Sequence, residues 1–319
     1  MQKLADISSF QALMNQTNGI PEGFPQNLAG LSWVNKLPRG RTDPSLYEDA
    51  QGQRFAVKGN QNNNYPPECA QNETMADRFY LDSGVPASQS AFVPPGVKVS
   101  RFIEGRPLNK WWDNASQQAR QKMQHTLRKG FPVDVLLDND DFIGDGGNVL
   151  VDRYGVPHRI DNDHALMYWG DEKRAINQDA EYVNLYRMLE RGSDLGLPPD
   201  QNTPNVQKYV GRIPVGQIVR EIGDRDWSVP GRNLSQEARN LIETRLRAIR
   251  QIKQISDELR SRGVPEQEVE GYINRFVKQI ADRNNGFLRD QYASKLGYPS
   301  KPIREIDMDS LLDKYKDRF

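Results

Sequence analysis

The chain has little of several residue types that define common classes of protein. Its 319 residues include one cysteine, Cys69, which excludes an intramolecular disulfide and a thiolate zinc cluster. The three histidines leave little for a His-rich metal site. No apolar run approaches the roughly 18 residues that a membrane-spanning helix needs, and residues 1–16 lack the pattern of a signal peptide. We therefore expect a protein without a membrane span, made in the cytoplasm; delivery as an effector or virion component stays open.

An excess of charge of one sign is also absent. Lys plus Arg number 43 and Asp plus Glu number 43, so the net charge is zero. A balanced charge argues against a surface built for nucleic acid or anionic lipid. At ~150 residues per domain, a chain of 319 residues suggests one large domain or two lobes.

The first half of the chain has the pattern of a mixed α/β lobe. Glycine and proline concentrate at residues 19–67 and again at 192–232, so we expect loops and short strands in both stretches. Short β-prone runs separated by turns predict a small sheet. The expected strands are residues 31–36, 45–48, 54–58, 91–93 and 97–103, and a helix is expected at 72–83.

The second half is predicted to be mainly helical. Apolar residues recur there at helical spacing, and one further series begins after Pro265. A hairpin pattern at 148–161 interrupts the helices. This order gives a small β-rich lobe, a connector near 100–105 and a larger helical lobe, which favours a ligand cleft between lobes. The expected helices are residues 115–129, 177–190 and 234–262.

The first feature with chemical content is Lys58, at the end of the strand sequence FAVK. Glu73 follows fifteen residues later, on the predicted helix. A strand lysine can contact the α and β phosphates of a nucleotide when a carboxylate holds it in place. Taken alone, the pair is better explained as an exposed lysine and a solvated glutamate, because such surface charges are the common case.

The second feature is an acidic, glycine-containing loop within residues 134–152. Phosphoryl transfer needs a carboxylate that orients or deprotonates the acceptor hydroxyl, and an amide or carboxylate oxygen that binds Mg2+. Asn148 begins the strand that follows this loop. A calcium loop is the alternative, but the EF-hand pattern with its glutamate at the twelfth position does not fit.

The third feature is HRIDNDHAL, residues 158–166. Asp161 follows a short strand and Asp163 lies two positions later. A carboxylate in this place could link Mg2+ to the β and γ phosphates. Each feature is weak alone; their order along the chain makes a nucleotide site the better interpretation.

Five segments carry these features: RFAVKG (54–59), NETMADRFYLDSGVPAS (72–88), KVSRFIEGRPL (98–108), GFPVDVLLDNDDFIGDGGNVLVD (130–152) and GVPHRIDNDHAL (155–166). Together they resemble the divergent kinase-like proteins grouped around HipA-type toxin kinases and phosphatidylinositol 3- and 4-kinases. The resemblance is greatest to a bacterial and phage-associated branch with a strand lysine, an NE-x-x-AD-x-x-Y helix and a GN-x-D-x-x-G catalytic region. It covers roughly residues 30–190.

The resemblance implies an α+β fold with two protein-kinase-like lobes and a helical C-terminal extension. The small β-rich lobe would span residues 31–104 and the larger helical lobe 105–232. An N-terminal helical segment (1–30) and the extension (233–319) would flank them. ATP and Mg2+ would be the cofactors.

The resemblance also implies how the nucleotide is held. Lys58 would contact the phosphates, with Glu73 as its ion-pair partner. The glycine-rich phosphate loop of the family is reduced here to residues 37–42, with a single glycine, so arginines and backbone amides would cover the phosphates. The residues expected there are Arg39, Gly40 and Arg41, and those expected at the adenine-binding hinge are Arg101, Phe102 and Ile103.

The metal and the catalytic base follow from the same resemblance. Asn148 and Asp161 would bind Mg2+, with Asp163 as a third candidate. Asp141 would be the catalytic carboxylate, but it stands seven positions before Asn148, further than the five of ordinary protein kinases. Asp145, three positions before Asn148, is therefore its rival.

The sequence thus predicts an ATP- and Mg2+-dependent phosphotransferase that acts on a protein hydroxyl. Its expected partners are a nucleotide and a protein substrate, with no strong signal for nucleic acid. Two alternatives stay open: a catalytically inactive interaction protein with the same fold, and a nucleotidyltransferase in which the α phosphate is attacked.

Overall fold

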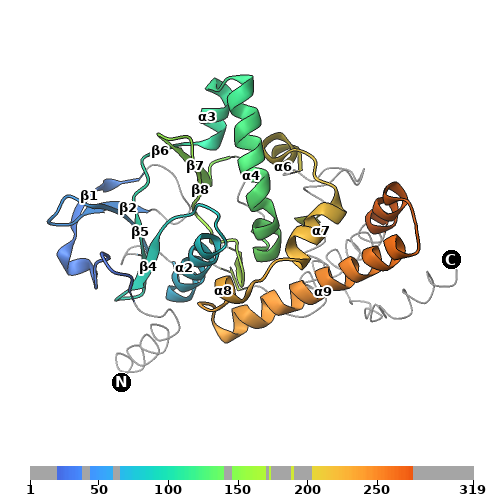
Figure 1. Ribbon diagram of the computed structural model, residues 1–319. Helices are drawn as coiled ribbons and strands as arrows, with labels where there is room; N and C mark the ends of the chain where they lie inside the picture. Colours follow the sequence, from blue (N-terminus) through green and yellow to red (C-terminus); the bar gives the residue numbers. More distant parts are fainter. Residues whose placement is uncertain are drawn as a thin grey trace, which may run out of the picture.

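The computed structural model describes the chain in several stretches, and these form a small β-rich lobe and a larger helical lobe (Figure 1). A cleft lies between the two lobes. The described residues are 20–37, 44–59, 65–139, 146–169, 172–173, 188–189 and 203–275.

The small lobe is built on a five-stranded antiparallel sheet in the order β1-β2-β3-β5-β4. Residues alternate between its two faces, as the period of a strand requires. One face carries a buried apolar cluster, the sheet core, made of Phe24, Phe55, Val57, Ala91, Val93, Val97 and Val99. The strands are β1 (Ser32–Lys36), β2 (Ser45–Glu48), β3 (Arg54–Lys58), β4 (Ser90–Val93) and β5 (Val97–Arg101), and a 3-10 turn, η1 (Leu28–Gly30), precedes them.

The helix α2 (Pro67–Asp82) packs against β4 and β5 of this sheet. It begins five residues before the expected start, because Pro67 occupies the first helical turn, where its missing N–H costs no hydrogen bond. Its C-terminal end is followed by Gly84, whose φ of +72° suits a helix end. Most apolar residues of α2 are buried, and Phe79 and Tyr80 are fully buried.

The large lobe begins with a three-stranded sheet in the order β6-β7-β8 and continues as helices. Its strands are β6 (Gly105–Pro107), β7 (Val149–Asp152) and β8 (Pro157–Arg159), and a two-residue pair follows, β9 (Tyr168–Trp169) and β10 (Glu172–Lys173). Its helices are α3 (Leu108–Asn114), α4 (Gln117–Leu137), α6 (Thr203–Val210), α7 (Val215–Gly223), α8 (Ser228–Gly231) and α9 (Gln236–Ser261), and residues 266–275 are also helical.

One buried apolar cluster, here the main core, joins the helices of the large lobe. It includes Phe131 of α4, Ile218 of α7 and Ile249 of α9. Phe79 and Tyr80 of α2 also belong to it. By its apolar packing, α2 is therefore continuous with the large lobe.

The two-lobed α+β kinase-like fold expected from the sequence is confirmed by this order of elements (Figure 1). Within residues 192–232, the expectation of loops and short strands is wrong, because α6, α7 and α8 lie there. Their prolines stand at helix starts: Pro204 is the second residue of α6 and Pro214 caps α7. Proline is common both in loops and at helix starts, so a concentration of proline does not distinguish the two. Most of the helix expected at 177–190 lies outside the described residues.

None of the helices within the described ranges is long and apolar enough to cross a membrane.

Candidate functional site

A cleft of about 400 Å3 opens between the two lobes. Apolar side chains lie on both of its walls: Leu37 and Ala56 from the small lobe, and Leu150 and Ile160 from the large lobe. Walls of this kind suit a flat, partly apolar ligand whose polar groups are bound at a few fixed points. Of the residues predicted from the sequence, the cleft brings together Lys58, Glu73, Arg101, Phe102, Ile103, Asn148 and Asp161.

Lys58 lies at the centre of the charged end of the cleft. Its Nζ is 2.9 Å from Glu73 Oε1 and 3.1 Å from Glu73 Oε2, and it also donates to Asp161 Oδ1. Burial would lower the pKa of the Lys58 ammonium, but the charges of Asp161 and Glu73 outweigh burial and raise it. The side chain is therefore a fixed positive charge that faces the cleft.

Glu73 is fully buried on α2 and is surrounded by donors. Tyr65 Oη donates to Glu73 Oε2 at 2.9 Å, and the backbone N–H of Asn162 donates to Oε1 at 3.2 Å. Burial would raise the pKa of this carboxyl, but Lys58 and Lys98 outweigh it and lower the pKa to about 2. Glu73 is thus ionised at any physiological pH.

Lys98 of β5 and Asp77 of α2 are parts of the site that the sequence interpretation missed. Lys98 Nζ lies 2.6 Å from Glu73 Oε1 and 2.6 Å from Asp77 Oδ2. A signal for both was present: Lys98 interrupts the apolar strand sequence VKVS, where an unpaired lysine is rare. Asp77 stands four residues after Glu73, on the same helix face.

Hydrogen bonds join α2 to the loop that follows β8. Asn162 Nδ2 donates to Asp77 Oδ1 at 2.7 Å. Asn72 Nδ2 donates to the carbonyl of Ala165 at 2.8 Å, and Asn72 Oδ1 accepts from the N–H of Met167 at 3.2 Å. These bonds fix the segment that carries Asp161 against the helix that carries Glu73.

The residues proposed for Mg2+ supply the donors that this ion prefers. Asn148 and Asp161 line the same cleft, and Asp163 lies close enough to Asp161 for their charges to interact. Mg2+ prefers oxygen donors and is commonly held by one or two carboxylates plus substrate phosphates, so this set fits it. Within the described ranges, no group of three or more His, Cys, Asp or Glu side chains forms a metal site on its own.

Asp163 is a partly buried carboxyl beside another acidic residue, and its pKa is shifted. Burial raises the pKa of the Asp163 carboxyl, and the negative charge of Asp161 raises it further, to about 7. A divalent cation held at this end of the cleft would favour loss of this proton, because its positive charge would stabilise the Asp163 carboxylate.

The connection between the lobes follows β5 directly. The N–H of Phe102 donates to the carbonyl of Arg54 at 3.0 Å, and residues 101–103 line the cleft. The Arg101 guanidinium lies over the ring of Phe24, 5.1 Å from its centroid, and donates to the carbonyl of Gly23 at 3.2 Å. The Arg101 side chain is thus held by Phe24 and Gly23 of the small lobe.

Some residues predicted for the site lie outside the described residues. They are Asp141, Asp145, Arg39, Gly40 and Arg41. Their roles stay predictions.

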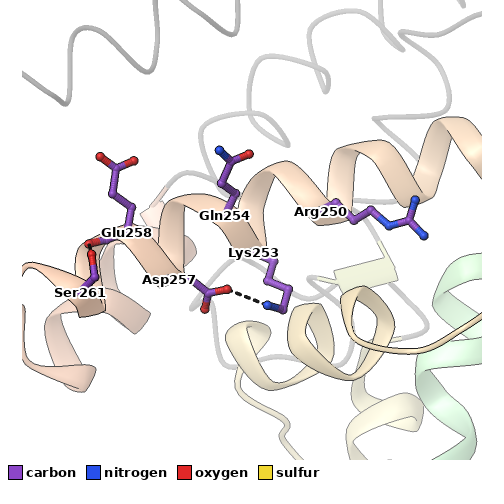
Figure 2. Close-up of a pocket in the computed structure, with 6 residues that line it drawn as sticks. All are labelled: Arg250, Lys253, Gln254, Asp257, Glu258 and Ser261. Carbon is purple, nitrogen blue, oxygen red and sulfur yellow. Dashed lines mark hydrogen bonds and ion pairs between the residues drawn. The ribbon is translucent and has the colours of Figure 1, made fainter.

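A second hollow lies along α9, far along the chain from these residues (Figure 2). Every residue that lines it belongs to α9, and Lys253 points toward Asp257, with Nζ 2.6 Å from Oδ2. This is an ion pair one helical turn apart, of the kind that stabilises exposed helix faces. The hollow has no fixed, buried polar group and is not a second candidate for the nucleotide site.

No protein-family model and no curated protein matches the chain. Among solved structures, the chain is similar to the Rio2 kinase–ADP/Mg2+–phosphoaspartate complex from Chaetomium thermophilum. The TM-score is 0.35 at 13% sequence identity, and the match covers 69% of this chain and 71% of that one.

Proposed function

We propose that the chain is an ATP- and Mg2+-dependent phosphotransferase whose acceptor is a protein hydroxyl. Its branch of the kinase-like fold would be the one that resembles HipA-type and phosphatidylinositol 3- and 4-kinases, and its compartment the cytoplasm. The observation that carries the proposal is the position of Lys58. It is held between Glu73 of α2 and Asp161 of the loop after β8, at the charged end of the cleft between the lobes.

The cleft offers a place for each part of the nucleotide. The base would lie between the apolar walls and bind the backbone of the connection at 101–103. Lys58 would then contact the phosphates, because its ammonium is buried, charged and oriented by Glu73. Arg39, Gly40 and Arg41 would cover the phosphates from the small lobe.

Asn148 and Asp161 would hold Mg2+, with Asp163 as the third candidate. When bound, the ion would neutralise charge on the β and γ phosphates. Asp161 at present accepts a hydrogen bond from Lys58. An exchange of that bond for the metal would leave the Lys58 ammonium directed at the phosphate group.

The acceptor hydroxyl would be oriented by a carboxylate of the acidic loop, which takes its proton as the phosphoryl group is transferred. Asp141 is the first candidate and Asp145 the second.

Incubation of the chain with ATP labelled at the γ or the α phosphate, with and without Mg2+, tests the proposal. We expect Mg2+-dependent transfer of the γ label to protein and no transfer of the α label. Transfer of the α label alone would identify a nucleotidyltransferase. If no label is transferred, the melting temperature decides, because a ligand that binds only the folded state at ~100 times its dissociation constant adds ~2.7 kcal/mol of stability. Stabilisation by MgATP without transfer would identify an inactive kinase-like protein, and no stabilisation would overturn nucleotide binding.

The two candidate bases are separated by matched substitutions. We expect Asp141→Asn to lower turnover by at least ~100-fold, the low end for a general base, with little change in MgATP affinity. Asp145 has glycine on both sides, and since glycine permits many backbone conformations, a carboxylate between two glycines is expected to orient a hydroxyl less well. Asp145→Asn should therefore have the weaker effect. Asp140→Asn, the adjacent carboxylate, serves as the control; the opposite ranking of 141 and 145 would move the base to Asp145.

A further inference from the structure

Lys98 is the second buried lysine at the sheet surface that faces α2. It is paired directly with Lys58 across the antiparallel strands β5 and β3, and side chains of such a pair emerge on the same face of a sheet. Only 3% of the Lys98 side chain is exposed, against 12% for Lys58. A lysine this deeply buried requires partners that offset the loss of its hydration.

The partners of Lys98 are two carboxylates one turn apart on α2. Its Nζ bridges Glu73 Oε1 and Asp77 Oδ2, each at 2.6 Å. Both carboxylates are buried, at 0% and 1% exposure. The Asp77 carboxylate accepts two further hydrogen bonds, one at Oδ2 from Ser90 Oγ at 2.6 Å and one at Oδ1 from Asn162 Nδ2.

This arrangement gives Glu73 a partner that a nucleotide would not displace. Lys58 would have to exchange contacts when phosphate and metal enter the cleft, because it now binds both Glu73 and Asp161. Lys98 also lines the cleft, but only 3% of its side chain is exposed and both of its partners are carboxylates of α2, so we expect it to keep these contacts when a nucleotide enters. Two contacts one helical turn apart also fix the direction of α2 relative to the sheet, which one contact would not.

We propose that Lys98 is a positioning residue: it holds Glu73 and Asp77 against the sheet, so that Glu73 keeps Lys58 directed at the phosphates. The proposal rests on the function proposed above. A reacting group displaced by about 1 Å can lose ~100-fold in rate. The loss should therefore appear in kcat more than in the KM for ATP, since the apolar walls, the hinge and the metal ligands stay in place.

The competing explanation is that Lys98 only stabilises the fold, and a double variant separates the two. Lys98→Met leaves two buried carboxylates with one lysine, which would also destabilise a protein in which Lys98 had no functional role. Lys98→Met combined with Asp77→Asn leaves one carboxylate, Glu73, with one lysine, Lys58. The charge balance is then restored while the support of Glu73 by Lys98 is absent.

We expect the double variant to melt within about 3 °C of the wild type and to lose at least ~10-fold in kcat, with less than about a threefold change in the KM for ATP. Lys98→Gln, which keeps N–H donors but no charge, is the second variant and is expected to change kcat in the same direction. Lys253→Met is the matched control, because it removes a lysine ion pair on α9 (Figure 2); its kcat should equal that of the wild type.

Wild-type kcat in the folded double variant would overturn the positioning role. If the double variant does not fold, wild-type kcat in folded Lys98→Gln overturns it instead. If the wild type neither binds MgATP nor transfers phosphate, the proposed function itself fails, and the inference falls with it. The two failures are thus distinguished by measurements on the wild type and on the variants.

Discussion

Asp161→Asn is expected to lower phosphoryl transfer by at least about 1,000-fold while the chain stays folded. Its carboxylate would be the main protein charge on Mg2+, and several kcal/mol of transition-state stabilisation correspond to about three factors of ten in rate. Asparagine is the right replacement because Asp161 has a φ of 57°, and asparagine tolerates this left-handed conformation better than most residues. Transfer of γ label at saturating MgATP and the urea midpoint are the measurements.

The control for this substitution is Asp152→Asn. Asp152 accepts the N–H groups of Tyr154 and Val156 in the turn of the β7–β8 hairpin, outside the cleft, and an asparagine oxygen can accept both. Its transfer rate should remain that of the wild type. Wild-type turnover in Asp161→Asn would remove the metal role from the segment at 158–166.

Arg159→Met is expected to destabilise the chain by about 3–5 kcal/mol, the range for removing one partner of a buried ion pair. Arg159 Nη2 lies 2.9 Å from Asp134 Oδ2, and the two side chains are 1% and 0% exposed. Tyr80 Oη donates to the same carboxylate at 2.7 Å. The helix α4 makes room for the guanidinium with Gly130, where a Cβ would stand 2.7 Å from Arg159 Nη2. Urea unfolding, followed by helix content, measures the change.

The loss in free energy of unfolding caused by Arg159→Met should become smaller as the pH falls. Burial raises the pKa of the Asp134 carboxyl, while Arg159 opposes the shift; without the arginine, the folded-state pKa rises further above the unfolded value. The folded variant then binds the extra proton, so its stability relative to the wild type increases from pH 8 to pH 5. A second substitution, Asp134→Asn, should remove this pH dependence.

The surface pair Arg78–Asp82 supplies the control for that experiment. The Arg78 side chain is 46% exposed, so Arg78→Met should lose less than about 1 kcal/mol. Equal losses in free energy of unfolding for Arg78→Met and Arg159→Met would contradict the claim that burial makes the Arg159–Asp134 ion pair important for stability.

Local pattern was enough to predict the strands of the small lobe and to place Lys58 at a strand end and Glu73 on a helix, whereas the pairing of the two was implied by the family resemblance. In RFAVK, the apolar residues Phe55 and Val57 face the sheet core, which leaves Lys58 on the opposite face. The spacing of apolar residues at the period of a helix likewise predicts α2. Both are properties of short segments, so a sequence alone carries them.

The role of Lys98 could not be predicted in this way, because it depends on strand register. Nothing in the sequence states that residue 98 pairs with residue 58, forty positions away. The bonds of Asn72 and Asn162 likewise join segments about ninety residues apart. Such contacts are decided by the packing of whole elements, and they supply much of the candidate site.

The division of the apolar residues into two clusters has a consequence for how the molecule can move. The sheet core belongs to the small lobe, whereas the apolar side of α2 belongs to the main core. The face of the sheet that meets α2 carries Phe92 of β4, whose ring joins the main core, and the two lysines Lys58 of β3 and Lys98 of β5, which pair with carboxylates of α2. α2 thus contacts both the sheet and the main core, and a shift of the sheet over α2 would have to exchange the ion pairs of Lys58 and Lys98. Nucleotide entry and a movement of the lobes would therefore act on the same four charged side chains, which are Lys58, Lys98, Glu73 and Asp77.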